Sequence, residues 1–269
     1  LNEIINQINW TVDTTLLGII SGTAATAIYG VGSQINQYYM ALSTSISGVF
    51  TPQINRIVAR GEGDEQLTKL FTRVGRIQFM LLMLVLTGFV FVGEPFICAW
   101  GGEEYGAAYW IALLLIAPVT VPLIQNIGIE IQRAKNMHQF RSKVYFCMAI
   151  GNALVSIPLG MKFGGIGCAL GTAISMVVGN GFIMNWYYQT HIGLDMRYFW
   201  KHILSIVPAM LPAVALGIIA VRLHTFTGYA GVVTFAVPYA AVYAVGLYLF
   251  AMDESEKNMV RGVMRKIRR

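Results

Sequence analysis

The sequence predicts an all-α fold, a polytopic membrane helix bundle of about eight transmembrane helices. Of its 269 residues, 56% are hydrophobic and only 12% are charged, which is about half the charged share of a typical soluble domain. Apolar runs of roughly 20 residues recur along the chain, and each is long enough to cross the hydrocarbon core of a bilayer as a helix. The mean hydropathy of +0.60 agrees with this fold class.

Eight segments qualify as membrane spans by their length and apolar content. They cover residues 1–18, 24–58, 77–100, 107–132, 144–163, 166–188, 203–221 and 230–252. Pro118 and Pro122 predict a kink in the fourth span. The first residues read like the middle of a helix and no initiator Met precedes them, so we expect the chain to be part of a longer protein.

Lysine and arginine residues mark one side of the predicted bundle. Seventeen of the 19 follow the second, fourth and sixth spans or lie in the C-terminal tail, and only Lys162 and Arg222 lie on the other side. Basic residues accumulate on the cytoplasmic side of membrane proteins, so we predict a multi-pass protein with a cytoplasmic C-terminus. Because this asymmetry accounts for the net charge of +6, we expect no nucleic-acid partner.

The residues that catalysis or metal binding would need are not grouped in the sequence. Cys98, Cys147 and Cys168 lie in apolar stretches without motif spacing, and the four histidines are scattered. The connections between spans are too short to fold as a catalytic domain, and no cofactor-binding motif is present. We therefore predict that the protein is not an enzyme and uses no cofactor.

The opening stretch, residues 1–59, carries more polar side chains than any later span. Asn6, Asn9 and Asp13 lie three and four residues apart, so they share one helical face with Asn2. Similar spacing recurs on the second helix, with alternatives at two positions: Ser33, Asn36 or Gln37, Met40, Ser43 or Thr44, and Ser47. Polar groups in hydrocarbon are costly unless they face a partner or water. The two stripes therefore predict a hydrated groove for a substrate or a coupling ion.

The candidate residues of this groove have alternative explanations. They are Asn6, Asn9, Asp13, Gln34, Asn36 and Gln37, with a weaker patch at Gln125 and Asn126. An amide taken singly is explained better by hydrogen bonding between helices, which contributes about 1 kcal/mol per bond, whereas the stripe as a unit favours the groove. Asp13 is either a proton or cation site or a wet carboxylate near the external end of its helix. An ordinary helix end beside Arg133 explains the weaker patch better than a site does.

Two further segments have a structural interpretation. Gly167, Gly171, Ser175 and Gly179 recur every four residues, which predicts a small-residue face for close helix packing. In the tail, Asp253 stands three residues before Glu256, a helix-capping pattern. The basic, amphipathic segment that follows predicts an interfacial helix on anionic membrane lipid. A basic end that serves only as a topology signal explains this segment equally well.

Several segments together resemble one family of membrane proteins. The segments INQINWTVDTTLLG, AIYGVGSQI and TPQINRIVARGEGDEQLTKLF resemble the seventh and eighth spans of bacterial oligosaccharide flippases of the Wzx type. The segments IEIQRAKNMHQFRSKVY and IPLGMKFGGIGCALGTAIS resemble later parts of the same proteins. Their superfamily, which is MATE-like, also includes the MATE drug exporters and the lipid II flippases.

The resemblance implies both an architecture and a function. Residues 1–190 would be the second six-helix lobe, with its first helix truncated, and residues 191–269 would add two helices and the basic tail. With an N-terminal lobe that this chain lacks, it would move a polyprenyl-diphosphate-linked oligosaccharide from the inner to the outer leaflet of the bacterial plasma membrane by alternating access. Polysaccharide polymerase machinery is a further candidate partner.

Two other functions remain open from the sequence. A MATE-type, cation-coupled multidrug exporter would use Asp13 as a coupling carboxylate. A membrane-embedded transferase subunit or a non-transporting scaffold is the alternative from another class. The amide-rich, acid-poor first hairpin and the basic loops favour the flippase.

Overall fold

The described chain is helical almost throughout. The computed structural model describes residues 14–15, 17–61 and 63–267, and no strand occurs among them. The long helices are α2 (Gly22–Arg60), α3 (Asp64–Gly101), α4 (Ala108–Ile124), α6 (Gln139–Met176), α9 (Val207–Leu223) and α10 (Gly228–Phe250). The shorter elements are η1 (Glu103–Tyr105), α5 (Ile127–Ala134), η2 (Val177–Met184), α7 (Asn185–Tyr187), η3 (Tyr188–Ile192), α8 (Met196–Leu204) and α11 (Glu254–Ile267).

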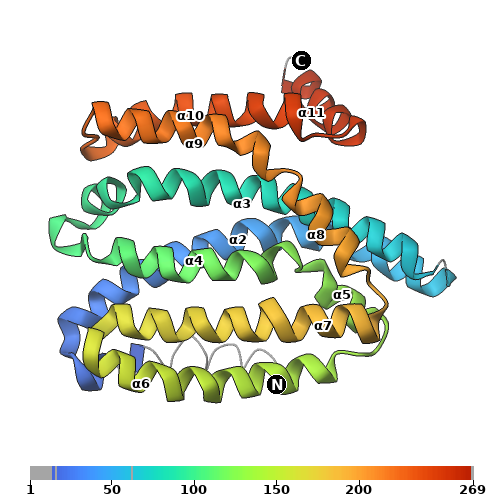
Figure 1. The fold of residues 1–269 in the computed structure, drawn as a ribbon, viewed down its shortest axis with the longest axis horizontal. Helices are drawn as coiled ribbons and strands as arrows, with labels where there is room; N and C mark the ends of the chain where they lie inside the picture. The colour runs from blue at the N-terminus through green and yellow to red at the C-terminus, as the bar shows by residue number, and fades with distance from the viewer. Residues whose placement is uncertain (1–13, 16, 62, 268–269) are drawn as a thin grey trace.

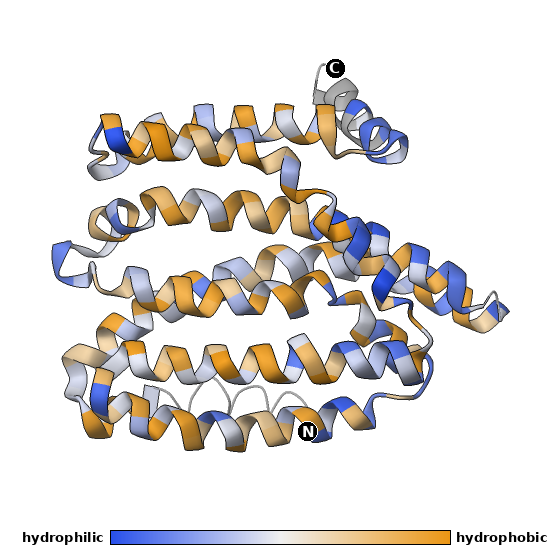
Figure 2. Cartoon of the chain, viewed as in Figure 1, coloured by the Kyte–Doolittle hydropathy of each residue, from blue (hydrophilic) through white to orange (hydrophobic). Residues whose placement is uncertain are grey.

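The long helices lie side by side and reverse direction at two opposite ends of the molecule (Figure 1). The α2–α3 turn, α5, the end of η3 and the start of α11 lie at one end. The α3–α4 connection and the α9–α10 turn lie at the other. Hydrophilic residues gather at the first end (Figure 2). The helices therefore alternate in direction as the distribution of basic residues predicts.

Among the described residues, four helical stretches are long and apolar enough to cross a membrane, and the bent pair α4–α5 would make a fifth. One of the four, Gln139–Ile192, is 54 residues long and folds back on itself at Gly164. Helix α2 is also long enough to cross a membrane, but its polar side chains lower its hydropathy and it is not among these stretches. All predicted spans except the first coincide with helices of the described chain, and most of the first lies outside the described residues. The fold class is thus confirmed, whereas eight remains a predicted number of spans.

The reversal at Gly164 depends on glycine. Its backbone angles, φ 57° and ψ −136°, belong to a region that side-chain-bearing residues rarely adopt. Beyond it, the predicted small-residue face packs against the preceding arm of α6. A Cβ on Gly171 would lie 2.2 Å from Ser156 Oγ, and one on Gly179 would lie 2.0 Å from Met148 Sδ. The two arms therefore approach more closely than larger side chains would allow.

Helices α4 and α5 form the kinked span that the prolines predict. They meet at a bend of 42°, just after Pro122. At the bend, Gln125 and Asn126 separate the two helices, and the Gly128 amide donates to the Gln125 carbonyl at 2.8 Å. Gln125 is buried, so the bend brings a polar side chain into the interior.

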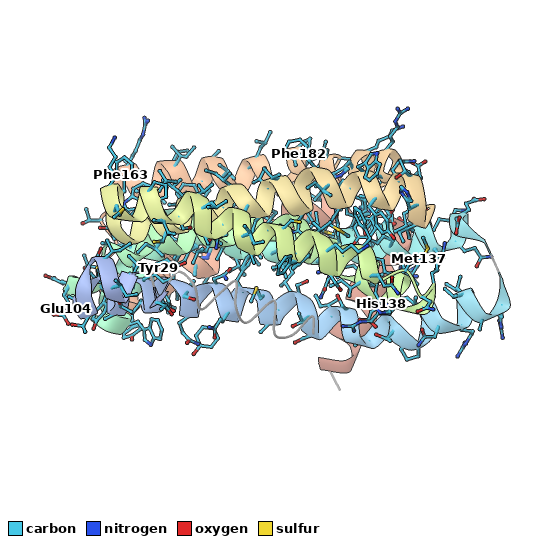
Figure 3. All side chains as sticks on the ribbon, turned by 90° about the horizontal axis from the view of Figure 1, so that it is seen from below. Tyr29, Glu104, Met137, His138, Phe163 and Phe182 are labelled. Atoms are coloured by element: carbon cyan, nitrogen blue, oxygen red, sulfur yellow. The ribbon has the colours of Figure 1, made fainter. Side chains whose placement is uncertain are left out.

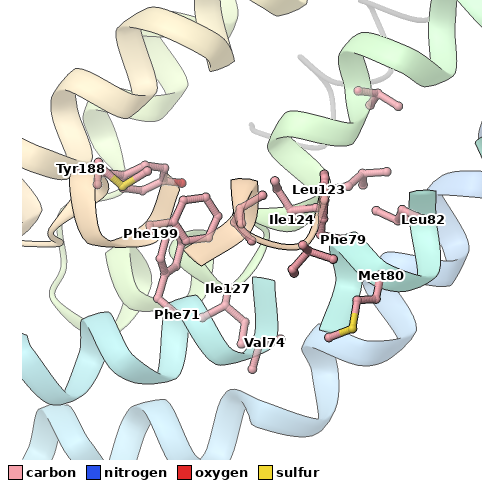
Figure 4. Packing of buried hydrophobic residues seen from close by; sticks show 14 of the residues in the cluster. Phe71, Val74, Phe79, Met80, Leu82, Leu123, Ile124, Ile127, Tyr188 and Phe199 are labelled. Carbon is pink, nitrogen blue, oxygen red and sulfur yellow. The ribbon is translucent and has the colours of Figure 1, made fainter. Parts of the chain in front are cut away.

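Aromatic rings join α3 to the segments at the basic end of the bundle. The ring of Phe71 lies 4.7 Å from that of Phe199 on α8 and 5.8 Å from that of Tyr188 on η3, between centroids (Figure 4). Gly75 lets α3 approach further, because a Cβ there would lie 2.7 Å from the Ile124 carbonyl oxygen. This cluster fixes α8, and through it the chain that leads to α9 and α10.

A buried ion pair attaches the C-terminal segment to α3. Arg76 Nε and Nη2 donate to the two carboxylate oxygens of Glu256 at 2.8 and 2.9 Å. Arg76 also donates to the carbonyl oxygens of His202 and Ala251 at 2.9 and 2.7 Å. The predicted capping box is present, since the Asp253 amide donates to Glu256 and the Glu256 amide to Asp253. Arg76 therefore connects α3, α8, the end of α10 and the start of α11.

Replacing Gly171 with Ala should destabilise the protein by about 1–3 kcal/mol, because the added methyl group meets the backbone of Ser156. Gly151 is a matched control on the same helix, since a Cβ there meets no atom within 4 Å. Gly151→Ala should leave stability unchanged or raise it slightly. Thermal unfolding in detergent measures both variants, and equal melting temperatures for the two would contradict the close packing of this face.

Replacing Arg76 with Met should cost about 3 kcal/mol, because it leaves the Glu256 carboxylate buried and unpaired. The double variant Arg76→Met/Glu256→Met should recover most of this loss, since neither charge then remains buried. Lys69→Met breaks an exposed, solvent-screened pair with Glu65 and should change stability far less than Arg76→Met does. Thermal unfolding of the three variants checks this order of stabilities. Equal melting temperatures for Arg76→Met and Lys69→Met would contradict it.

Candidate functional site

Helix α2 has one face buried against the rest of the bundle. Gly32 packs on α4, where a Cβ would lie 2.8 Å from Ile111 Cγ2. Two turns along the same face, Tyr39 Oη lies 2.8 Å from Thr120 Oγ1 and donates to the Leu82 carbonyl oxygen at 3.2 Å. These contacts attach α2 to α3 and α4 and determine which side of α2 faces outward.

A second face of α2, beside the buried one, carries a polar stripe. We call it the α2 stripe; its members are Thr23, Thr26, Gly30, Gln34, Gln37, Ala41, Thr44, Gly48, Thr51 and Asn55. Each member follows the previous one by three or four residues, so they share a face, and all are exposed or half-exposed. No apolar side chain on the stripe is larger than that of Ala. At 1.5 Å per residue the stripe is about 48 Å long, which exceeds the hydrocarbon thickness of a bilayer.

The hydrogen-bonding groups of the stripe differ in their availability. The Thr26 hydroxyl donates to the Gly22 carbonyl, and the Thr44 hydroxyl to the carbonyls of Met40 and Ala41, so they are satisfied within the helix. Within the described part of the chain, the side-chain amides of Gln34 and Gln37 have no hydrogen-bonding partner. They are available to water or to a bound molecule.

The stripe is also electrically neutral. No Lys, Arg, Asp or Glu occurs on α2 before Arg56. The stripe can therefore offer hydroxyl, amide and backbone groups to a polar ligand, but no ionic partner. Figure 3 shows α2 along the lower edge of the bundle, where it carries Tyr29 near one end.

The structure separates the residues that the sequence grouped on the second helix. Gln34 and Gln37 belong to the stripe, whereas Asn36 is fully buried on the face that packs against the bundle. Neither amide atom of Asn36 has a hydrogen-bond partner among the described residues. Asn6, Asn9 and Asp13 lie outside the described residues, so their place in a groove remains a prediction.

The buried hydroxyls of α2 hydrogen-bond within the bundle. Ser43 Oγ donates to the Leu123 carbonyl at 2.8 Å. Gln78 Nε2 of α3 lies 2.9 Å from Ser43 Oγ and 2.8 Å from Ser47 Oγ. At the two positions where the sequence left alternatives, Asn36 and Ser43 are buried while Gln37 and Thr44 are exposed. Sequence reasoning missed Gln78, although it is a single amide within an apolar run.

The weaker predicted patch leads to a buried polar junction. Gln125 Nε2 donates to Asn185 Oδ1 at 3.0 Å, and Trp200 Nε1 of α8 donates to the same oxygen at 2.7 Å. Asn185 Nδ2 donates to the Asn180 carbonyl oxygen at 2.8 Å, and Asn180 lies in the π-helical segment η2. Asn185 thus links the α4–α5 bend to α8. Asn126 is half-exposed at the bend.

Known proteins share parts of this sequence and fold. No protein-family model matches the chain. It is 26% identical over 174 residues to the probable flippase AglR of Haloferax volcanii, a match that covers 63% of this chain and 36% of that protein. Its fold matches the lipid II flippase MurJ in an inward closed conformation, with a TM-score of 0.74 and 16% identity, over 93% of this chain and 52% of that one.

These matches identify the architecture and the general class. The chain has the fold of part of a polytopic membrane transporter, and it spans between about a third and a half of the length of the two proteins. AglR is described as a probable flippase and MurJ as a lipid II flippase, so the similarity is to transporters rather than to enzymes.

Replacing Asn36 with Leu, which has nearly the same shape, should raise stability by about 1–3 kcal/mol, because it removes a buried amide without a hydrogen-bond partner. Ser43→Ala is the matched control on the same face. It removes a hydroxyl that is bonded and should lower stability by about 1 kcal/mol. Thermal unfolding gives both values, and a loss of stability in Asn36→Leu would show that Asn36 has a partner in the folded protein.

Proposed function

We propose that this chain forms the C-terminal half of a flippase that carries a lipid-linked oligosaccharide from the inner to the outer leaflet of the cell membrane. The α2 stripe is the observation that carries the proposal. A polar, uncharged face as long as the bilayer is thick is unsuited to lipid, because its amides would lack partners there. It therefore lines a path for a polar molecule.

The chemistry of the stripe fits the sugar part of such a substrate. Gln34 and Gln37 offer free amides that both donate and accept hydrogen bonds, as sugar hydroxyls require. Small residues before and after them on the stripe, such as Gly30, Ala41 and Gly48, leave room for a bulky head group. The lipid tail would remain in the bilayer while the head group passes along the stripe.

Alternating access requires two parts that move against each other. The described helices supply one wall, and the match to about half of MurJ supports a second wall from a lobe outside this chain. The cation-coupled exporter is supported less well, since no carboxylate lies on the α2 stripe and Asp13 is outside the described residues. We place the protein in the bacterial plasma membrane with its basic end in the cytoplasm, as the positive-inside rule favours.

Single cysteines on the stripe should react with a water-soluble maleimide. In the purified protein with its three native cysteines replaced by serine, Gln37→Cys and Thr44→Cys should label at least tenfold faster than Leu211→Cys and Ile219→Cys. The two control residues are 60% and 55% exposed on α9 and are apolar, so they face lipid. Reaction rates in liposomes, followed by mass shift, make the comparison.

The same variants distinguish the candidate substrates. A polyprenyl-diphosphate-linked oligosaccharide should slow labelling at Gln37→Cys, whereas an organic cation that exporters carry should not. Protection by the cation alone would favour the exporter. Equal labelling of stripe and control cysteines would exclude a hydrated path along α2.

A further inference from the structure

The C-terminal helix α11 leaves the last spanning helix at a fixed angle. Helix α10 ends at Phe250, and α11 begins at Glu254 after a short turn. Glu256 in the first turn of α11 is 3% exposed and is paired with Arg76 of α3, so the start of α11 is anchored to the bundle. Figure 1 shows α11 turned away from the axis of α10.

The junction of α10 and α11 exposes apolar side chains. Leu249 and Phe250, the last two residues of α10, are 61% and 74% exposed. Apolar side chains this exposed at the end of a spanning helix belong in the hydrocarbon region. We therefore expect the first turns of α11 to lie where the acyl chains give way to the headgroups.

Two cations gather around one phenol at this junction. Arg261 Nε and Nη2 lie 3.3 and 3.2 Å from Tyr248 Oη, and Lys257 Nζ lies 5.7 Å from the centre of the Tyr248 ring. Lys257 and Arg261 are four residues apart and so share a face of α11. Their positive groups stand beside the exposed end of α10.

The surrounding charge favours an anionic occupant. From Lys257 to Arg269 the sequence holds six basic residues and no acidic one. Glu254 Oε1 lies 3.8 Å from Lys257 Nζ, but its side chain is 78% exposed, and such surface pairs are weak. Arg73 donates to Ser255 Oγ in the first turn and adds a further cation there. In the sequence of α11 the acidic residues precede the basic ones.

We propose that Tyr248, Lys257 and Arg261 form a docking surface for the headgroups of anionic phospholipids, which holds α11 on the membrane surface. Lysine and arginine donate to phosphate oxygens, the phenol donates a third hydrogen bond, and the acyl chains of the same lipid lie against Leu249 and Phe250. A cytoplasmic leaflet rich in anionic lipid attracts each basic residue near its surface. The surface is independent of the transported substrate.

Native mass spectrometry of the purified protein tests this surface. In detergent doped with equal amounts of phosphatidylglycerol and phosphatidylcholine, the wild-type protein should retain phosphatidylglycerol preferentially. Lys257→Gln/Arg261→Gln should weaken this retention, by about fivefold for each cation removed, without changing retention of phosphatidylcholine. The matched control is Lys162→Gln/Arg222→Gln, which removes the same charge at the opposite end of the bundle and should behave like the wild type.

A second measurement leaves both cations in place. A fluorophore attached at Asn258→Cys, which is exposed on α11, should shift to the blue in nanodiscs containing phosphatidylglycerol relative to phosphatidylcholine alone. About 0.5 M salt should reverse the shift, because it screens exposed charges over a few ångströms. Equal retention of phosphatidylglycerol by the two double variants, or a probe that does not respond to lipid charge, would overturn the proposal.

Discussion

Within a bilayer a polar group needs a partner or water, and helix α2 meets this constraint differently on its two faces. On the inner face, Tyr39 and Ser43 find partners on α3 and α4. On the outer face, the hydroxyls of Thr26 and Thr44 bond back to the helix, while Gln34 and Gln37 have no partner among the described residues. The second face is therefore compatible with a membrane only if it borders water or another protein surface. The packing of the first face determines that the second one points outward.

The ion pair of Arg76 and Glu256 has a comparable role at the basic end of the bundle. A guanidinium group with four bonds, two of them to one carboxylate, holds elements that are far apart in the sequence. Both charged groups are nearly buried. Separating them would therefore leave each one unpaired in apolar surroundings, which is costly. The C-terminal helices are thus attached to α3 by an interaction that has one favourable geometry. Motion of α3 would consequently carry the start of α11 with it.

Much of the fold follows from local sequence patterns, whereas the site depends on packing. The repeated glycines within residues 144–188 predict two close-packed helices, and Asp253 with Glu256 predicts a helix start. In contrast, Asn36 and Gln37 are neighbours separated by 100° on α2, and only contacts with α3 and α4 decide which of them is buried. The Arg76–Glu256 pair joins residues 180 positions apart, and Asn185 meets Gln125 across 60 positions. No local pattern contains such pairs.

The neutrality of the α2 stripe constrains how a charged, lipid-linked substrate could be recognised. Amides and hydroxyls bind sugar hydroxyls well, but a diphosphate in a low-dielectric pathway needs cations nearby. On the described helices the arginines and lysines lie near the ends of the bundle, and α2 contributes none along its stripe. A cation at the depth of Gln37 would have to come from the opposing wall. The two walls would then divide recognition: this chain would contact the sugar, and the opposing lobe would bind the phosphates. In such a pathway the charge of the substrate would be neutralised only after both walls have closed on it. Substrate recognition would therefore be coupled to the change of access.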